Sequence, residues 1–319
     1  MNISFAIDHA YVRYCAATMA SVLENNKDMH TVFHVVGNGL SGSDKSALSG
    51  LAGRYGAEAK FYEVPSEMMD GYKVRWGGKR LSMAVFYRLA LASLLPGDVG
   101  RTLYLDCDVI VNKPIRSFYA MPMEGIAVAA AQDMLKPVPE FFERLGYDIS
   151  EGYFNAGVAL LNLDYWREND VEQRLKSHYA ANSERMERND QDLMNAVLHA
   201  EKKMVSLKWN AQDEFFRLCH YADPEERAIC LKAVRDPAII HFSYKEKPWL
   251  YDCCHPLRHL FAKYQSLTPF NDWKRIESPA NRLHRFVHLL PYSLGMKPWK
   301  YITSEQLDRL LTNEPASTL

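Results

Sequence analysis

Short apolar runs alternate with helical patterns along most of the chain. Runs rich in apolar residues predict strands at residues 3–7, 31–36, 60–64, 101–105, 125–130, 157–161, 204–207 and 238–242. Apolar positions at helical spacing predict helices at residues 11–24, from 43 onward, and at 81–95, 164–180 and 190–200. Strands that alternate with helices over short connections form a mostly parallel sheet covered on both faces, so the pattern predicts an α/β fold.

Composition narrows the class of protein. The 319 residues are 48% hydrophobic and 24% charged, which is ordinary globular usage and argues against disorder or a coiled coil. The 38 basic and 39 acidic residues leave a net charge of −1, so a surface built for nucleic acid is not expected. No apolar stretch is long enough to span a bilayer, and the opening MNISFAID lacks the basic start of a signal peptide.

The cysteines do not form a disulfide pattern. Six are present, at Cys15, Cys107, Cys219, Cys230, Cys253 and Cys254. None has CxxC spacing, so the spacing gives no support to a zinc site, and an adjacent pair is awkward to bridge. We therefore expect free thiols and a reducing cytoplasm.

Two acids follow an apolar strand at the place where open α/β sheets bind ligands. Asp106 and Asp108 come directly after the strand at 101–105. Residues two apart in an extended chain point the same way, so both carboxylates face the crevice while Cys107 faces the packing side. Carboxylates this close repel unless a cation lies between them, and Mg²⁺ or Mn²⁺ suits oxygen ligands. The competing interpretation is a solvated turn with two acids.

Three more side chains are candidates because of their positions. His241 ends the apolar run of a strand, and an imidazole beside two carboxylates would favour Mn²⁺ over Mg²⁺, although a structural histidine is the commoner case. Lys247 precedes a proline that stiffens the backbone, which would hold the ammonium over a phosphate if it is not a plain surface lysine. Arg88 lies on the apolar face of its helix and needs a buried partner, such as Asp106 or Asp108.

Other polar positions have a structural explanation of equal weight. Asn189 and Asp190 begin a predicted helix, where either would cap it and acids would complement its dipole. Asn155 and Gly157 precede a predicted strand and suit a turn. The chain has no Walker A loop, GxGxxG or GxSxG motif. A carboxylate site without a glycine loop needs its metal to hold a diphosphate.

Taken together, the motifs resemble glycosyltransferase family 8, the retaining enzymes that use nucleotide sugars. The resemblance runs from about residue 3 to 249. It rests on motifs that occur in the family's order: FAID at 5–8, YRL at 87–89, LYLDCD at 103–108, YFNAG at 153–157, DQD at 190–192, and His241 followed by KPW at 247–249.

The resemblance implies a GT-A fold, Rossmann-like, with a mostly parallel mixed sheet flanked by helices and a DxD motif. Residues 1–250 would form the catalytic domain and 251–319 a basic helical extension. Asp106, Asp108 and His241 would bind Mn²⁺, with Mg²⁺ as the alternative. The other implied roles are substrate contacts by Ala6 and Asp8 (uracil), Lys247 (phosphates), and Arg88, Asp133, Asn155, Asp190 and Gln191 (donor sugar). Gln191, Asp190 and Arg88 would also be the catalytic residues.

The chemistry implied is transfer of glucose or galactose from a UDP-sugar. Double displacement needs a nucleophile, for which the family offers Asp190 and Gln191. An amide is a poor nucleophile, so we expect front-face attack with Gln191 stabilising the oxocarbenium-like state. Two positions depart from the family pattern: His9 follows Asp8, and Tyr244 lies in the stretch where a glycine is usual.

The tail suggests the acceptor. Residues 279–300 hold Arg282, Arg285, Lys297 and Lys300 among aromatic and apolar residues, with no acid. Such a segment suits an anionic membrane surface or an anionic acceptor, or it packs as a helical cap. The extension also resembles that of lipopolysaccharide-core transferases, which implies a lipopolysaccharide-core acceptor at the inner face of the cytoplasmic membrane.

Two other functions compete with this interpretation. A haloacid-dehalogenase-type phosphatase also uses Asp-x-Asp after an apolar strand, but near its N-terminus and before a Gly-Thr turn, whereas here Val109 and Ile110 follow. A sugar-nucleotide-binding protein without turnover would keep the same metal and sugar residues, and the change at Tyr244 is compatible with it.

Overall fold

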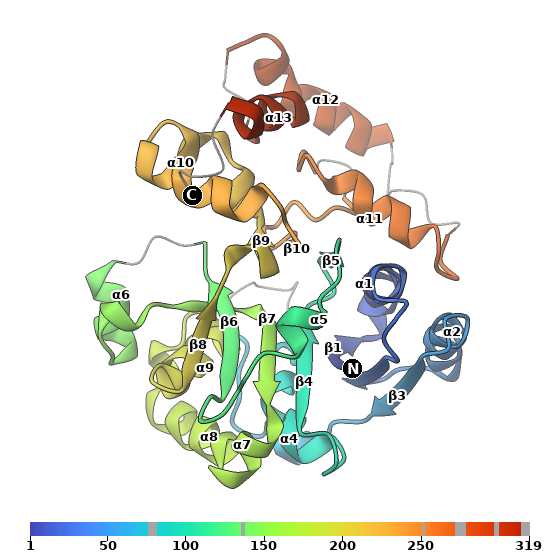
Figure 1. Cartoon of the computed structure of the whole chain (residues 1–319), viewed down its shortest axis with the longest axis vertical. Coiled ribbons are helices and arrows are strands. Elements are labelled where there is room, and N and C mark those ends of the chain that lie inside the picture. The colour runs from blue at the N-terminus through green and yellow to red at the C-terminus, as the bar shows by residue number, and fades with distance from the viewer. Residues whose placement is uncertain (76–81, 135–137, 251–252, 272–278, 297–299, 314–319) are drawn as a thin grey trace.

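A seven-stranded sheet organises the molecule, in the order β3-β2-β1-β4-β7-β6-β8 (Figure 1). This computed structural model describes residues 1–75, 82–134, 138–250, 253–271, 279–296 and 300–313. The strands are β1 (Asn2–Asp8), β2 (Val32–Asn38), β3 (Glu58–Tyr62), β4 (Arg101–Leu105), β6 (Val128–Gln132), β7 (Phe154–Asn162) and β8 (Lys202–Val205). Only β7 runs against its two neighbours, while the other pairs are parallel. The predicted mixed, mostly parallel sheet is confirmed.

Side chains alternate between the two faces of the sheet, as a period-2 pattern requires. Leu103 and Leu105 of β4 join the core that contains α1 (Val12–Asn25) and α2 (Gly42–Gly53). Tyr104 between them joins the opposite core, with α7 (Leu163–Glu168), α8 (Val171–Asn182) and α9 (Asn189–Leu198). Each face is thus covered by helices, which explains why the central strands read as continuous apolar runs.

A second, three-stranded sheet brings distant segments to the end of β4. It consists of β5 (Val109–Val111), β10 (Ile239–His241) and β9 (Ala211–Gln212), in the order β5-β10-β9. β10 is antiparallel to β5, with His241 opposite Val109. Because Val109 directly follows Asp108, this register places the histidine beside the two acids.

Two predicted helices are interrupted. Residues 81–95 form α3 (Ala84–Tyr87), a 3₁₀ turn (Arg88–Ala90) and α4 (Leu91–Leu94), with residue 81 outside the described part. The tight turn holds Arg88, whose guanidinium is directed into the molecule. Residues 164–180 divide into α7 and α8, because Asp170 adopts a left-handed conformation with φ 49°.

Some strand bounds also differ from the prediction. β7 starts at Phe154, three residues before the predicted strand, because its first residues pair with β6 at Gln132. Asn155 and Gly157 therefore lie in a strand, and the turn interpretation is wrong. The remaining short helices are α5 (Arg116–Tyr119), α6 (Pro139–Leu145) and α10 (Pro224–Val234).

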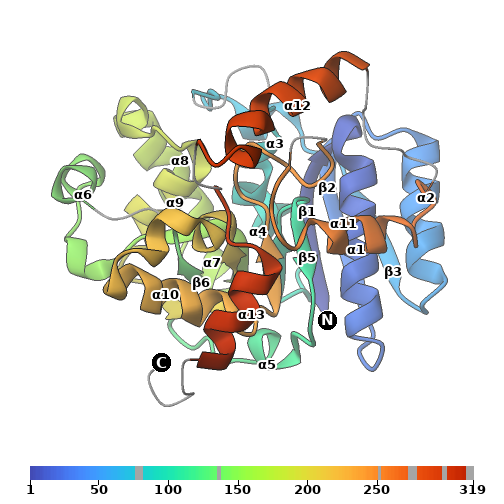
Figure 2. The ribbon, with the colours of Figure 1, turned by 90° about the horizontal axis from the view of Figure 1, so that it is seen from above.

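The C-terminal part is helical, as expected. It contains α11 (Arg258–Gln265), α12 (Pro279–Ser293) and α13 (Ser304–Asn313), which lie with α10 at one end of the molecule (Figure 1). α11 packs against α1, and α12 runs along the periphery (Figure 2). No helix in the described part of the chain has the length and apolar character that a bilayer-spanning segment needs. All six cysteines are free thiols.

Candidate functional site

Asp106, Asp108 and His241 form a cluster at the carboxyl end of β4. His241 Nε2 lies 3.3 Å from Asp108 Oδ1 and 3.9 Å from Asp106 Oδ2. One ligand atom from each of the three lies within 4.8 Å of the other two. Cys107, between the acids, faces the hydrophobic core as predicted. The arrangement is compact enough for a single divalent cation, which the solvated-turn interpretation does not explain.

A chain of hydrogen bonds sets the tautomer of His241. The Gly157 amide donates to Asn155 Oδ1 (3.0 Å), so that atom must be the amide oxygen, and Asn210 Nδ2 donates to it as well (2.9 Å). Asn210 Oδ1 then faces His241 Nδ1 at 3.0 Å and accepts a hydrogen bond from its N–H. The lone pair of His241 Nε2 is therefore directed at the two carboxylates, as a metal-ligating histidine requires.

Gly157 makes the room for this cluster. A Cβ at this position would collide with the His241 ring and would lie 2.5 Å from Asp106 Oδ2. The glycine is thus needed for close approach and not for a special backbone angle. Sequence reasoning missed both this requirement and Asn210, which is fully buried. The sequence signal for the close approach was the Asn-x-Gly spacing of Asn155 and Gly157.

Arg88 is buried among acids, as its position on the apolar face predicted. Its Nη2 donates to Asp106 Oδ1 (2.9 Å), its Nε lies 3.0 Å from Asp190 Oδ2, and its Nη1 donates to the Ala156 carbonyl (2.8 Å). Burial alone would lower the pKa of the guanidinium, but Asp106 and Asp190 hold that pKa above its ordinary value. Arg88 therefore stays charged and fixes one carboxylate of the cluster.

Lys247 lies on the other side of the cluster. Its ammonium contacts Asp108 Oδ2 and donates to the Phe242 carbonyl (2.7 Å). Burial opposes ionisation of Asp108, yet the neighbouring charge of the Lys247 ammonium holds its pKa below the ordinary value. Asp108 is accordingly an anion, and Lys247 is placed beside it and not on open surface.

The predicted sugar-binding residues meet around Asp133. Asp133 Oδ2 accepts from Asn155 Nδ2 and from Gln191 Nε2, both at 2.9 Å. Gln191 Oε1 accepts from the Ala156 amide at 3.1 Å. Asp190 is buried, and burial raises its pKa to about 6 in spite of Arg88. The prediction that Asn189 or Asp190 caps α9 is wrong, because the cap residue is Arg188, whereas the predicted placement of acids in the first turn is confirmed.

Asp8 and Ala6 lie apart from this group, at the end of β1. Burial raises the pKa of Tyr11, and the negative charges of Asp108 and Asp8 raise it further, so Tyr11 lies near both acids. Asp8 Oδ1 is buried and has no hydrogen-bond partner among the described residues. Ala6 is partly buried against the α7–α9 core. His9, the departure from the family pattern, turns away and pairs with Asp44 at 2.7 Å.

A cavity of about 1260 Å³ opens beside Asp133. Its walls include Gln132, Met134 and Tyr244, together with residues of α10 and the turns before it. The Arg217 guanidinium lies 4.0 Å from the centre of the Tyr244 ring. The second departure from the family pattern therefore forms part of this wall, where a glycine would leave more space.

The cluster fits a divalent cation on its own chemistry. His241 Nε2 carries a lone pair, and Asp108 Oδ1 lies 3.3 Å away, buried and without a hydrogen-bond partner. Two acceptors this close are stable only with a proton or a cation between them. Two carboxylates and one imidazole suit Mn²⁺ among the common divalent ions.

Comparison with known proteins points in the same direction. The model of the family described as "Glycosyl transferase family 8" matches residues 2–253. The chain is 25% identical over 287 residues to general stress protein A of Bacillus subtilis (strain 168), which covers 88% of this chain and 97% of that protein. It is 23% identical over 295 residues to the lipopolysaccharide 1,2-glucosyltransferase of Escherichia coli, with 91% and 85% covered.

Solved structures confirm the expected fold. The galactosyltransferase LgtC, crystallised with donor and acceptor sugar analogues, matches with a TM-score of 0.74 at 24% identity. The match covers 89% of this chain and 100% of that one. The glycosyltransferase GlyE of Streptococcus pneumoniae TIGR4 matches with a TM-score of 0.63 at 19% identity and covers 95% and 66%.

Proposed function

The chain belongs to glycosyltransferase family 8, and on that premise we propose that it transfers glucose or galactose from a UDP-sugar to a saccharide, with retention of configuration. The observation that carries the proposal is the Asp106, Asp108 and His241 cluster, with His241 Nε2 directed at the two carboxylates. No feature of the comparisons favours a phosphatase.

In the proposed enzyme, Asp106, Asp108 and His241 hold Mn²⁺, or Mg²⁺ as the alternative. The ion, when bound, would bind the diphosphate and neutralise the negative charge that develops on the UDP leaving group. Lys247 would help to neutralise the negative charge on the leaving group, because its ammonium lies beside the Asp108 carboxylate. Asp8, with its unpartnered Oδ1, and the neighbouring Ala6 accommodate the uracil.

The donor sugar would lie against Arg88, Asp133, Asn155, Asp190 and Gln191. Two contacts support front-face attack over double displacement. Asp190 Oδ2 is engaged by Arg88 at 3.0 Å, and Gln191 Oε1 accepts from the Ala156 amide. A side chain held by such contacts cannot readily turn to attack the anomeric carbon. Gln191 can still stabilise the positive charge that develops on that carbon.

For the acceptor we propose the cavity beside Asp133. Its volume of about 1260 Å³ accommodates several sugar rings, and it adjoins the residues assigned to the donor sugar. The relative from Escherichia coli is named as a lipopolysaccharide 1,2-glucosyltransferase. Lipopolysaccharide core is therefore the proposed acceptor, with residues 1–250 as the catalytic domain and 251–319 as an extension that serves the acceptor or the membrane.

An exposed apolar face on α12 supports the proposal that the extension attaches to a membrane. One face of α12 exposes apolar side chains: Leu283 (64%), Phe286 (63%), Val287 (59%) and Leu290 (37%). Spacing of three and four residues places them on one stripe. An apolar stripe near basic residues binds anionic bilayers from one side, which would place the protein at the inner face of the cytoplasmic membrane. Arg285 belongs to this segment by sequence, and Lys297 lies outside the described residues.

Vesicle flotation tests this attachment. Phosphatidylglycerol vesicles should carry the wild-type protein to the top of a gradient, less so at high salt, and Phe286→Glu should remain at the bottom. Flotation of Phe286→Glu like the wild type, or no flotation of the wild type, would contradict the proposal.

Donor hydrolysis tests the enzymatic function. We expect release of UDP from UDP-glucose or UDP-galactose in Mn²⁺, loss of release in EDTA, and loss in Asp106→Ala. A protein that binds UDP with Mn²⁺ but stays inactive with every donor, even with core oligosaccharide added, would be a binding protein without turnover. Absence of UDP binding would refute the proposed function.

A further inference from the structure

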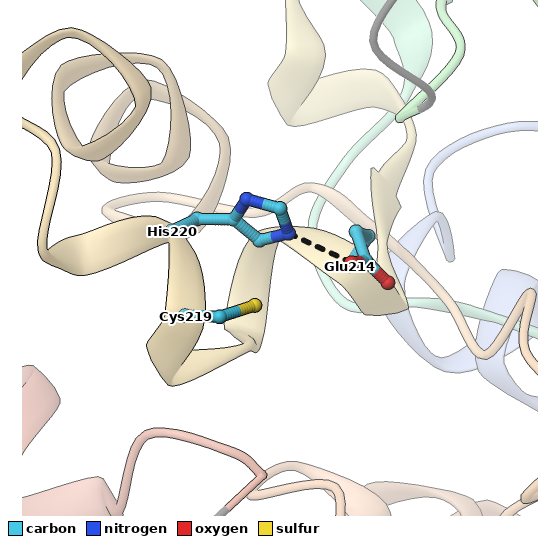
Figure 3. Close-up of side chains that lie close together, drawn as sticks. All are labelled: Glu214, Cys219 and His220. Atoms are coloured by element: carbon cyan, nitrogen blue, oxygen red, sulfur yellow. Dashed lines mark hydrogen bonds and ion pairs between the residues drawn. The ribbon is translucent and has the colours of Figure 1, made fainter.

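A second group of metal-ligating side chains shares no residue with the DxD cluster, and two of its three members line the cavity. Glu214, Cys219 and His220 come from two consecutive 3₁₀ turns, Asp213–Phe216 and Leu218–Tyr221. One ligand atom from each lies within 4.8 Å of the other two. Figure 3 shows the three side chains converging, with the His220 ring directed at Glu214. The donor site proposed above makes no use of them, although Glu214 and His220 line the proposed acceptor cavity.

The ligands of this group are themselves oriented by charged neighbours. His220 Nε2 lies 2.7 Å from Glu214 Oε1, and on its other side Nδ1 lies 3.1 Å from Glu226 Oε2. The second oxygen of Glu214 pairs with Arg217 Nε at 2.8 Å. A carboxylate behind a histidine and a hydrogen-bond donor behind a ligating carboxylate are the partners that metal-binding side chains require.

The ligand atoms are close to the spacing that a tetrahedral ion demands. Zinc bonds of about 2.0 Å to nitrogen and about 2.3 Å to sulfur place neighbouring ligand atoms roughly 3.5 Å apart. His220 Nε2 and Glu214 Oε1, which lie 2.7 Å apart, would separate slightly to admit the ion, and Cys219 is an exposed side chain that can rotate toward them. Thiolate, imidazole and carboxylate together favour zinc over Mn²⁺ or Mg²⁺.

We propose that Glu214, Cys219 and His220 bind one Zn²⁺ ion and that this ion ties the two 3₁₀ turns to each other and, through Glu226, to α10. Glu214 and His220 line the cavity, so the fourth coordination position opens toward it and takes a water molecule. On binding, the ion replaces the proton of Cys219 Sγ and any proton on His220 Nε2, and these protons go to solvent. The site is independent of the donor-binding cluster and of its function.

Thiol protection tests the site in the unaltered protein. Cys219 is exposed and should react with iodoacetamide, and equimolar Zn²⁺ should abolish that reaction. Partly exposed Cys254 serves as the internal reference, with unchanged labelling. Peptide mass spectrometry reads both positions. Equal labelling of Cys219 with and without Zn²⁺ would overturn the proposal.

Cobalt substitution then identifies the ligands. Co²⁺ bound with excess Mn²⁺ present should show a thiolate-to-cobalt charge-transfer band, which the oxygen and nitrogen ligands of the DxD cluster cannot give. Cys219→Ser and His220→Ala should lose the band, and Cys254→Ser should keep it. Glu226→Gln should keep the band and bind zinc about 10–100-fold more weakly.

The variants also separate the site from misfolding and from the donor site. Glu226→Gln and Cys254→Ser both keep the three ligands, so they report on the site even if Cys219→Ser fails to fold. A charge-transfer band that persists in folded Cys219→Ser, or that disappears in Cys254→Ser, would refute the ligand assignment. UDP binding in Mn²⁺ should be unchanged in Cys219→Ser, which keeps this test apart from that of the proposed function.

Discussion

Replacement of Asn210 by alanine tests how the His241 lone pair is directed. The Asn210 amide accepts from His241 Nδ1 (3.0 Å) and donates to Asn155 Oδ1 (2.9 Å). Without it, the imidazole loses the partner that keeps the proton on Nδ1, so its other nitrogen is no longer fixed as a metal ligand. Loss of such a partner typically weakens metal binding by about 10–100-fold, or roughly 1.4–2.7 kcal/mol.

The substitution also carries a stability cost that needs its own control. Two buried hydrogen bonds disappear, at about 1 kcal/mol each. Asn26→Ala is the matched control, because Asn26 is buried and also makes two hydrogen bonds, from its Nδ2 to the Val22 carbonyl and from the Ile115 amide to its Oδ1, both 2.9 Å. It packs at the end of α1, far along the chain from the cluster.

Titration of Mn²⁺ followed by the electron paramagnetic resonance signal of the free ion measures the effect, and urea unfolding measures stability. We expect both variants to lose about 2 kcal/mol of stability, but only Asn210→Ala to lose Mn²⁺ affinity. Wild-type affinity in Asn210→Ala, or an equal loss in Asn26→Ala, would refute the tautomer argument.

Three other substitutions address the same site. Gly157→Ala should abolish Mn²⁺ binding and cost about 1–3 kcal/mol of stability, because the added Cβ meets the His241 ring. An intact metal site in the folded variant would contradict the close-approach argument. Burial raises the pKa of Asp190 from 3.8 to about 6, so folding takes up a proton and the free energy of unfolding falls as pH rises through that window. Urea unfolding across the window should show this slope in the wild type and not in Asp190→Asn, and an unchanged slope would exclude Asp190 as its source. Lys247→Met should weaken UDP binding roughly tenfold or more by calorimetry. Mn²⁺ binding without UDP should not weaken, because Asp108 loses a competing cation. A parallel loss of UDP binding and Mn²⁺ binding would show that Lys247 has a structural role.

Much of the site could be predicted because local pattern places it. Apolar runs define β1 and β4, and residues that end such runs lie at the ligand-binding edge of the sheet. The alternation in β4 directs Asp106 and Asp108 one way and Cys107 the other. Helical spacing turns Arg88 inward even though its helix is broken, because the two short helices and the 3₁₀ turn between them follow one another without a gap.

Only the tertiary structure decided how these residues meet. His241 arrives beside Asp108 through the antiparallel register of β10 on β5, which joins segments more than a hundred residues apart in sequence. Asn210 has no motif around it, and its importance comes only from touching His241 and Asn155 at once. Gly157 suits a turn in sequence, yet the ladder with β6 extends the strand and makes the glycine a space for the cluster.

The same distinction holds for the zinc site proposed at Glu214, Cys219 and His220. Cysteine spacing alone indicated no zinc, because only one of the three ligands is a cysteine and the pattern of paired cysteines is missing. The sequence by itself determined the fold class, the edge of the sheet that carries the acids and the family. Packing determined the hydrogen-bond partners, tautomers and close approaches, because these depend on side chains from strands and turns that sequence order does not bring together.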